Sequence, residues 1–372
     1  MDGPAALRKA YLKYGGNVSE PVATVVDLLA GGQTIDQGDS GEVTATPYNT
    51  DDQLYTVPVT VGGQTFILDL DTGSSDFWLY SAEINPSKLH GQATFDASKS
   101  STFEKMDGYT FDIGYADGSS STGYVGTDVA VVGGVAFDKQ AFGIATDVSG
   151  SFAALYNCDG LLGAGYPYGV DYGNTIKPVG QKTFFANVIS TLTLPVFTAD
   201  LGKTTGSYEF GAIDSSKFVG ALMYAPIDTS TTYWEFASPA FKVGDSRWNW
   251  PSDYYVSIVV DSGSQFMMLQ QGLVDTYYDT VDGAVTDYPN YSNTYVFPCN
   301  ASLPTLGLAM GDHDQFATIA PEHLIYSDIG NDGMCMGALQ YSLSGGPQIL
   351  GDPFFRSQFV VFDAGNAQVG VA

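Results

Sequence analysis

The sequence predicts an all-β fold built from two related lobes with a few short helices. Of its 372 residues, 44 are glycine, and Val, Thr, Tyr and Phe are frequent in the runs between glycine-bearing turns. β-branched and aromatic residues favour strands, while glycine favours the tight turns that join them. A motif that occurs twice divides the chain into two halves, and this repeat predicts the two lobes.

The repeat consists of two matched pairs of motifs. Asp71-Thr72-Gly73-Ser74 follows the apolar run FILDL, and Asp261-Ser262-Gly263-Ser264 follows YYVSIVV. Each is later answered by two apolar residues and a glycine: Gly163 lies 92 residues after Asp71, and Gly351 lies 90 residues after Asp261. Nearly equal spacing indicates a duplicated lobe, so a pseudo-twofold axis should relate the two halves.

Each motif carries an aspartate to the end of an apolar strand and follows it with a glycine. A single copy is ordinary turn chemistry, but a glycine there also lets a second main chain approach closely. With two copies, Asp71 and Asp261 would face each other across the axis. Like charges about 3 Å apart resist joint ionisation, so the pair would share one proton in mild acid. One carboxylate then serves as a base and one carboxyl as an acid for the same water.

The charge balance excludes some partners. The chain has 41 acidic and 14 basic residues, for a formal net charge of -27. Nucleic acid requires a basic surface, so we expect no nucleic-acid partner. No stretch reaches the roughly 18 apolar residues of a membrane span, so we expect no membrane partner. The excess of carboxyl groups fits a protein that works in acid, where protonation lowers its self-repulsion.

The three cysteines predict one disulfide and one buried thiol. Cys299 and Cys335 both lie near turn residues and should pair, whereas Cys158 should be a small buried hydrophobe. A disulfide implies an oxidising compartment. The first residues, MDGPAALRKAYLKYG, contain no apolar signal core, so a signal peptide would be missing from this sequence. Three glycosylation sequons agree with secretion, at Asn17, Asn290 and Asn300.

Residues 1–42 differ from the rest of the chain. ALRKAYLKYGG has the apolar spacing of a short basic amphipathic helix, which is either an ordinary terminal helix or a segment that docks on the acidic body. Residues 31–42, GGQTIDQGDSGE, read as an exposed linker and a cleavage region. Beyond residue 43 short strands dominate, with helical patterns at 181–191, 271–281 and 320–326.

These motifs resemble those of the pepsin-like aspartic endopeptidases, especially the secreted fungal branch, over residues 43–372. The resemblance rests on FILDLDTGSSDFW, YADGSSSTGYVGTDVAVVGG, DGLLGAGY, VVDSGS and QILGDPFFRSQFVVFDAGNAQVGVA. It implies a bilobal pepsin-like fold with a central cleft and lobes at 43–225 and 226–372. It also implies a secreted, extracellular, monomeric acid endopeptidase that needs no cofactor or metal and binds protein and peptide substrates and pepstatin-like inhibitors.

The resemblance assigns roles to the two motifs. Asp71 and Asp261 would bind and activate the attacking water, with no covalent intermediate. The other members would support them: Thr72 and Ser262 by reaching the opposite main chain, Gly73 and Gly263 by allowing close approach, and Ser74 and Ser264 by hydrogen bonding to the outer carboxylate oxygens.

Further positions match the substrate-binding parts of the family. Tyr115 stands at the position of the tyrosine in the flap, a hairpin that closes over substrate, and Trp78 would be its hydrogen-bonding neighbour. Phe152 and Leu161 stand where the main apolar pocket is lined, although core packing is a rival explanation for both.

Two acidic residues refine the expected specificity. Asp69 and Asp117 match a fungal variant that accepts lysine, which implies cleavage after Phe, Leu or Tyr with Lys tolerated. The sequence departs from the family pattern at Gln265, where a small hydroxyl residue is usual, and at Ala116, where the flap usually has glycine.

The basic amino-terminal segment resembles a propeptide remnant. Lys13-Tyr14 matches the lysine-tyrosine pair of pepsin-type zymogens, whose lysine lies between the catalytic carboxylates at neutral pH. Residues 1–42 would then be a propeptide remnant and linker, and the enzyme's own propeptide would be one of its partners. Acid would release this segment and allow cleavage near residue 40.

Other functions fit the sequence less well. His90, His313 and His323 form no metal-binding pair, and the GDSG at 38–41 has no matching histidine motif. A glycosidase would use two carboxylates but would not predict the repeat or a flap. The main alternative is a catalytically silent pepsin-like binding or inhibitor protein. Such proteins often lose a catalytic aspartate or the flap tyrosine, and this chain has all three.

Overall fold

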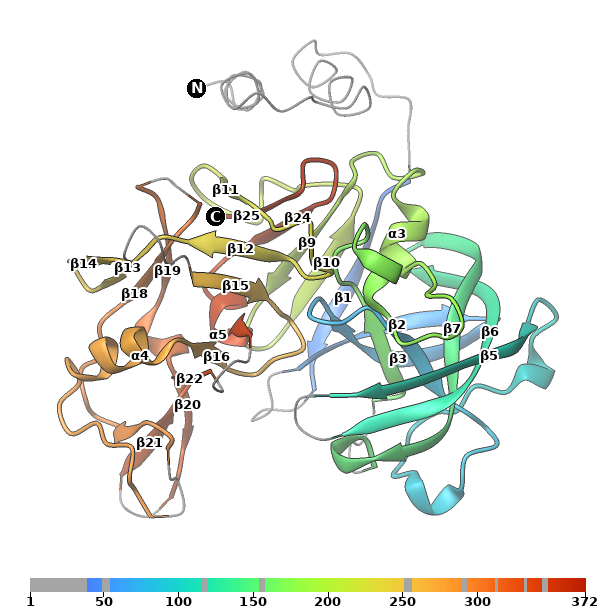
Figure 1. Cartoon of the computed structure of the whole chain (residues 1–372), viewed down its shortest axis with the longest axis horizontal. Coiled ribbons are helices and arrows are strands. Elements are labelled where there is room, and N and C mark those ends of the chain that lie inside the picture. Colours follow the sequence, from blue (N-terminus) through green and yellow to red (C-terminus); the bar gives the residue numbers. More distant parts are fainter. Residues whose placement is uncertain are drawn as a thin grey trace, which may run out of the picture.

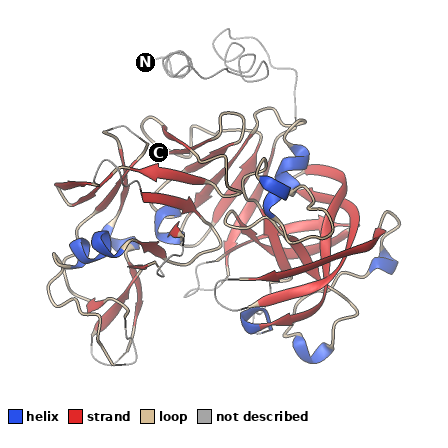
Figure 2. Cartoon of the chain, viewed as in Figure 1, coloured by secondary structure: helices blue, strands red, loops and turns tan. Residues whose placement is uncertain are grey.

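The computed structural model describes residues 39–48, 54–115, 119–153, 158–250, 256–289, 293–311, 314–330, 333–342 and 347–372. Strands dominate these residues, and the few helices are short (Figure 2). The chain forms two lobes, one drawn in blue to green and the other in orange to red (Figure 1). The predicted all-β, bilobal fold is therefore confirmed.

The largest sheet has thirteen strands. Their order is β11 (Met223–Pro226), β25 (Gln368–Val371), β24 (Val360–Asp363), β9 (Val196–Leu201), β10 (Gly206–Phe210), β1 (Gly41–Pro47), β2 (Tyr55–Val61), β3 (Gln64–Asp71), β8 (Gly160–Gly163), β4 (Phe77–Tyr80), β7 (Val135–Ser149), β6 (Ser120–Val132) and β5 (Glu104–Gly114). Because β2 also pairs with β6, the barrel of the N-terminal lobe closes through the strands β2, β3, β8, β4, β7 and β6.

The C-terminal lobe contains three smaller sheets. The first is β12 (Glu235–Ser238), β15 (Val256–Val260), β23 (Gln348–Leu350), β16 (Met267–Leu269) and β22 (Leu339–Tyr341). The second is β14 (Ser246–Asn249), β13 (Ala240–Val243), β18 (Leu306–Ala309) and β19 (Phe316–Ile319). The third is β17 (Val296–Pro298), β21 (Met334–Gly337) and β20 (Ile325–Asp328).

The helices confirm two of the predicted segments. The α-helices are α3 (Phe184–Val188), α4 (Gln271–Tyr278) and α5 (Asp352–Phe355), and the 3-10 turns are η1 (Pro86–Lys88), η2 (Ala97–Lys99), η3 (Gly150–Ala153), η4 (Val170–Gly173) and η5 (Pro321–His323). At 320–326 the helix is shorter than predicted, because the segment forms the 3-10 helix η5 and then enters β20. The helix predicted near the amino terminus lies outside the described residues.

The two lobes share a strand pattern that matches the sequence repeat. In the N-terminal lobe β3 and β8 run parallel and β4 joins β8 antiparallel; in the C-terminal lobe β15, β23 and β16 repeat this arrangement. Asp71 pairs with Gly163, and the Asp261 N–H donates to the Leu350 carbonyl at 3.0 Å. The paired motifs are therefore neighbours in space in each lobe.

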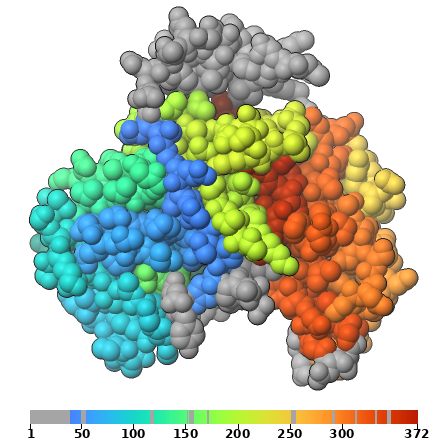
Figure 3. Space-filling model, turned by 180° about the vertical axis from the view of Figure 1, so that it is seen from behind, coloured from blue at the N-terminus to red at the C-terminus, as the bar shows by residue number. Residues whose placement is uncertain are grey.

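The lobes are joined through main-chain pairing and a shared apolar core. The last strands of the chain, β24 and β25, pair with β9 and β11, so the predicted boundary at residue 225 falls inside β11. Seen from behind, the segment with β9 to β11 lies between the lobes (Figure 3). Phe197 and Phe362 stack with ring centroids 4.4 Å apart, and the buried Trp234 donates to the Ala164 carbonyl at 2.8 Å. These contacts fix one lobe against the other.

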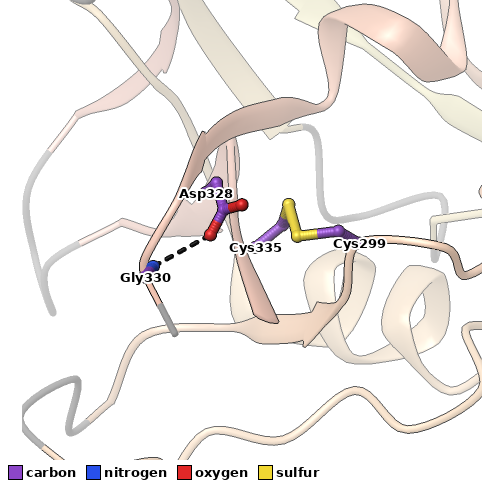
Figure 4. Close-up of a disulfide and its surroundings, with 4 residues drawn as sticks. All are labelled: Cys299, Asp328, Gly330 and Cys335. Carbon is purple, nitrogen blue, oxygen red and sulfur yellow. Dashed lines mark hydrogen bonds between the residues drawn. A yellow bond between two sulfur atoms is a disulfide. The ribbon is translucent and has the colours of Figure 1, made fainter. Parts of the chain in front are cut away.

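The cysteines behave as predicted. Cys299 and Cys335 form a disulfide that joins the end of β17 to β21, beside the turn in which Asp328 accepts the N–H of Gly330 (Figure 4). Cys158 is a buried thiol whose Sγ donates to the Gly160 carbonyl at 3.3 Å. Within the described residues no helix is long and apolar enough to cross a membrane.

Candidate active site

Two strands bring Asp71 and Asp261 together at the junction of the lobes. Phe66, Leu68 and Leu70 of β3 are buried, and this packing holds the strand that ends at Asp71. β15 is likewise buried along most of its length and delivers Asp261 from the other lobe. Asp71 itself is only 6% exposed.

Four reciprocal hydrogen bonds join the two motifs. Thr72 Oγ1 donates to the Val260 carbonyl at 2.8 Å and accepts the Ser262 N–H at 2.9 Å. Ser262 Oγ donates to the Leu70 carbonyl at 2.6 Å and accepts the Thr72 N–H at 3.1 Å. Both side chains are fully buried. The predicted reach of Thr72 and Ser262 to the opposite main chain is thus present in the structure.

The glycines of the motifs lie directly against the opposite carboxyl groups. A Cβ atom at Gly73 would overlap the side chain of Asp261, and one at Gly263 would overlap the side chain of Asp71. Each glycine N–H also donates to the aspartate of its own motif, at 2.8 Å for Asp71 and 2.9 Å for Asp261. The two carboxyls can therefore approach closely only because glycine, which has no Cβ atom, occupies positions 73 and 263.

The serines of the two motifs differ in the geometry of their contacts with the aspartates. Ser264 Oγ donates to Asp261 Oδ2 at 2.6 Å, as expected. The Ser74 hydroxyl is buried and makes no hydrogen bond of normal geometry within the described part of the chain. It still lies close enough to the Asp71 carboxyl to lower the pKa of that group as a hydrogen-bond donor does. The predicted bond from Ser74 to the outer oxygen of Asp71 therefore stays a prediction.

Burial and neighbouring charge govern the protonation of Asp71. Burial raises the pKa of Asp71 well above its usual range, and the nearby Asp261 and Asp69 raise it further. A carboxyl in this environment retains its proton in mild acid, while Asp261 accepts hydrogen bonds at both oxygens. The pair thus meets the physical condition for a shared proton.

An aromatic cluster lies next to Asp71 and Asp261, which together form the carboxyl dyad. Trp78 Nε1 donates to the Tyr115 hydroxyl at 2.9 Å, which is the predicted contact. The Phe152 ring lies 5.1 Å from that of Trp78 and 4.9 Å from that of Tyr115. Leu161 belongs to the same cluster and pairs with Asp69 across β8 and β3. Phe152 is half-buried and Leu161 is buried, so packing and pocket lining are both consistent with their positions.

Some predicted site residues cannot be compared with the structure. Lys13, Tyr14, Asp117 and Ala116 lie outside the described residues. Asp69 is described: it is 8% exposed, its Oδ1 has no hydrogen-bond partner among the described residues, and burial together with Asp261 raises its pKa to about 8. Asp69 therefore keeps its proton at acid and neutral pH.

The sequence did not reveal two further buried carboxyls near the site. Asp352 is fully buried with both oxygens unpartnered in the described chain, and burial raises its pKa well above the usual range. Asp76 accepts the N–H and hydroxyl of Thr175, yet burial raises its pKa to about 6. Asp352 directly follows Gly351, so the repeat itself could have marked it. Within the described residues no three His, Cys, Asp or Glu side chains are placed to hold a metal ion.

Comparisons with known proteins agree with this geometry. The protein-family model described as "Eukaryotic aspartyl protease" matches residues 54–372. The "Aspartic protease PEP3" of Coccidioides posadasii is 38% identical over 100% of this chain and 86% of its own length. A "Putative aspergillopepsin A-like aspartic endopeptidase" of Arthroderma otae is 40% identical over 100% of this chain and 90% of its own. "Penicillopepsin-1" of Talaromyces stipitatus is 39% identical over 98% of this chain and 87% of its own.

The raised pKa values predict that the protein loses stability as pH rises. A carboxyl whose pKa is higher in the folded than in the unfolded chain stabilises the fold below the unfolded value of about 4, and this contribution is lost as pH rises through the folded value. The windows are about pH 4 to 6 for Asp76 and about pH 4 to 8 for Asp69. Urea unfolding at several pH values should show a falling free energy of unfolding across this range.

Two variants and a control sharpen this test. Between pH 4 and 6, Asp76→Asn should remove about 1–3 kcal/mol of the fall in the free energy of unfolding. Asp69→Asn should flatten the plot of this free energy against pH up to about pH 8. Asp314→Asn serves as the control, because Arg247 lowers the pKa of this exposed carboxyl out of the window. A stability that rises from pH 4 to 8, or the same slope in all variants, would contradict the linkage.

Proposed function

Since the chain belongs to the eukaryotic aspartyl protease family and is an aspartic endopeptidase of the aspergillopepsin and penicillopepsin type, we propose that Asp71 and Asp261 activate the water that cleaves internal peptide bonds in acid. The observation that carries the proposal is the reciprocal bonding of Thr72 and Ser262, which holds the two carboxyls face to face.

The environments of the two carboxyls suggest their roles. Burial and the facing carboxyl raise the pKa of Asp71, so we assign the shared proton to it; Asp261 would then accept the water proton as general base. Water oxygen bonds to the carbonyl carbon as Asp71 passes its proton to the carbonyl oxygen. The resulting tetrahedral diol collapses when Asp261 passes the proton from water to the amide nitrogen, the carbon–nitrogen bond breaks, and one diol hydroxyl returns its proton to Asp71. The dyad then regains its single proton without a covalent intermediate.

The aromatic cluster supports a preference for large apolar residues before the cut. Tyr115, held by Trp78, would close over the substrate, and Phe152 and Leu161 offer apolar surface beside it. An apolar side chain buried there gains roughly 1.5–3 kcal/mol. This preference suits partly unfolded proteins and peptides as substrates.

We propose that lysine is tolerated at the same position through Asp117 and Asp69. Asp69 is buried and uncharged in acid, so it would contribute less than Asp117. Asp117 would supply the negative charge.

We propose further that the protein is secreted and matures by losing its basic amino-terminal segment in acid. The disulfide and the acidic composition support an extracellular setting. The described main chain limits the cut: Asp39 N–H donates to the Thr191 carbonyl, Thr193 N–H donates to the Asp39 carbonyl, and Lys217 binds Glu42 at 2.6 Å. Proteolysis needs an unpaired segment, so the cut should precede Asp39.

The dyad predicts a test of activity. The wild-type protein should hydrolyse denatured haemoglobin or casein in acid, and a statine-type transition-state analogue should stop it. Asp71→Asn and Asp261→Asn should each lower kcat by at least about a thousandfold, because each removes one partner in proton transfer. Initial rates at matched protein concentration measure this. Asp314→Asn, far from the motifs in sequence and exposed, is the control and should retain the wild-type rate.

Two results would overturn the proposal. Turnover that survives Asp71→Asn would exclude the dyad mechanism. A wild-type protein that binds the analogue but cleaves nothing would instead support the alternative, a catalytically silent pepsin-like binding or inhibitor protein.

The lysine preference predicts a separable effect. Profiling a peptide library with Asp117→Ala should remove cleavage after Lys and keep cleavage after Phe, Leu and Tyr. Asp69→Asn should weaken the lysine component less, because Asp69 is uncharged in acid and the substitution removes no negative charge. Lysine cleavage that persists in Asp117→Ala would show that this assignment is wrong.

Maturation predicts a change in mass. A shift of the full chain from neutral to acid pH should shorten it, with a new amino terminus at or before Asp39, as intact mass and terminal sequencing would report. An unchanged mass with full activity would contradict the propeptide assignment, and a terminus beyond Glu42 would contradict the limit set by β1.

A further inference from the structure

One glycosylation sequon lies in a part of the chain that the structure describes. Asn300-Ala301-Ser302 follows β17 in the C-terminal lobe, whereas Asn17 and Asn290 lie outside the described residues. Asn300 and Ser302 are exposed, and Ala301 between them is half-buried. An N-linked sugar chain is bulky and polar, so the asparagine that carries it must lie on the surface. This sequon meets that requirement in the folded protein.

Asn300 occupies the third position of a tight turn. The Ala301 N–H donates to the Pro298 carbonyl at 2.8 Å, which closes a four-residue β-turn. The turn is anchored, because the Cys299 N–H donates to the Gly333 carbonyl at 2.9 Å and the Cys299 side chain is tied to β21 by the disulfide (Figure 4). A turn held in this way keeps Asn300 at the surface of the lobe.

A hollow adjoins the sequon. It has a volume of about 310 Å³ and is lined by Thr280, Asp282, Ser302, Leu303 and Pro304. One wall is fixed from inside the lobe, since the hydroxyl of the buried Tyr277 donates to the Pro304 carbonyl at 2.9 Å. Ser302 belongs to the sequon itself, so a sugar attached two residues earlier in the chain begins beside this hollow.

The lining of the hollow suits an N-acetylhexosamine. Such a sugar carries hydroxyl and amide N–H donors, together with an apolar acetyl methyl group. The Asp282 carboxylate is an acceptor, and so is the Thr280 hydroxyl, whose own proton goes to the Tyr277 carbonyl at 2.6 Å. Leu303 and Pro304 supply an apolar surface for the methyl group. The hollow therefore matches N-acetylglucosamine, which is the first sugar of an N-linked chain.

We infer that Asn300 carries an N-linked oligosaccharide whose first N-acetylglucosamine packs into the hollow. In the transfer, the bond from C1 of that sugar to the diphosphate of a lipid-linked oligosaccharide breaks, and a bond from C1 to Asn300 Nδ2 forms. The lipid diphosphate leaves with the bonding electron pair, and the Asn300 nitrogen loses one proton to a base. Ser302 supplies the hydroxyl of the sequon. The inference rests on the proposed secretion, because a secreted chain meets this donor on its route.

Mass spectrometry of the secreted full chain tests the modification. The chain is expressed behind a signal peptide in a yeast host with Asn17→Gln and Asn290→Gln, which leaves Asn300 as its one sequon. The protein should carry one sugar chain, and peptide-N-glycosidase F should remove it. Asn300→Gln and Ser302→Ala should each abolish the added mass. Ser302→Thr should retain it, because threonine keeps the hydroxyl.

Thermal unfolding tests the packing of the first sugar. Endoglycosidase H trims the chain to a single N-acetylglucosamine on Asn300, and Asn300→Gln is the sugar-free reference. The single-sugar form should melt about 1–3 °C above this reference. Asp282→Ala should at least halve the difference, because it removes an acceptor from the hollow. Asp287→Ala is the matched control: this exposed aspartate does not line the hollow, and the variant should retain the difference.

The possible failures are distinguishable. A secreted chain with no sugar on Asn300 would overturn the modification site. Equal melting temperatures of the single-sugar form and Asn300→Gln, or a difference that Asp282→Ala leaves unchanged, would overturn the packing of the sugar in the hollow. A protein that carries the sugar but cleaves neither casein nor haemoglobin in acid would instead overturn the proposed function and leave this site standing.

Discussion

The reciprocal hydrogen bonds between Thr72 and Ser262 are the interaction on which the rest of the structure depends. Each hydroxyl bonds the main chain of the opposite lobe, so two separate turns become one rigid unit. Only with this unit in place can Gly73 and Gly263 lie against the opposite carboxyls. The same junction is also held by the stacked rings of Phe197 and Phe362 and by the strand pairs that join the lobes. The site is therefore a product of lobe packing, not of either lobe alone.

This arrangement places an unusual electrostatic constraint on the protein. Asp71, Asp69 and Asp352 lie near one another, and burial raises the pKa of each. Deprotonating any of them leaves a charge in a poorly solvated environment. In acid these carboxyls are protonated, which removes the cost of a buried charge and also gives the dyad its single proton. The stability of the fold and the chemistry proposed for the site thus share one pH requirement, which agrees with the acid setting that the net charge of -27 predicts.

Sequence reasoning captured what local pattern and duplication encode. The repeat predicted that the two motifs would meet, and turn chemistry predicted that Cys299 would pair with Cys335. It failed where the outcome depends on tertiary detail. The two motifs read alike, yet Ser264 Oγ donates to its aspartate at 2.6 Å, whereas the contact of Ser74 with Asp71 departs from normal hydrogen-bond geometry. The burial of Asp352 depends on residues distant in the chain. Likewise, the pairing of Gln265 with Tyr326 joins positions that no local pattern links.

The central claim, that the Thr72 and Ser262 hydroxyls hold the dyad together, can be tested most directly with Thr72→Val. Valine keeps the shape of threonine but leaves the buried Val260 carbonyl and Ser262 N–H without partners, at a cost of about 1–3 kcal/mol each. We measure kcat and the free energy of unfolding in acid, with Thr72→Ser as the matched control that retains the hydroxyl. The account predicts that Thr72→Val lowers both quantities, with kcat down at least about tenfold, and that Thr72→Ser stays near wild type. Wild-type values in Thr72→Val, or equal losses in both variants, would contradict it.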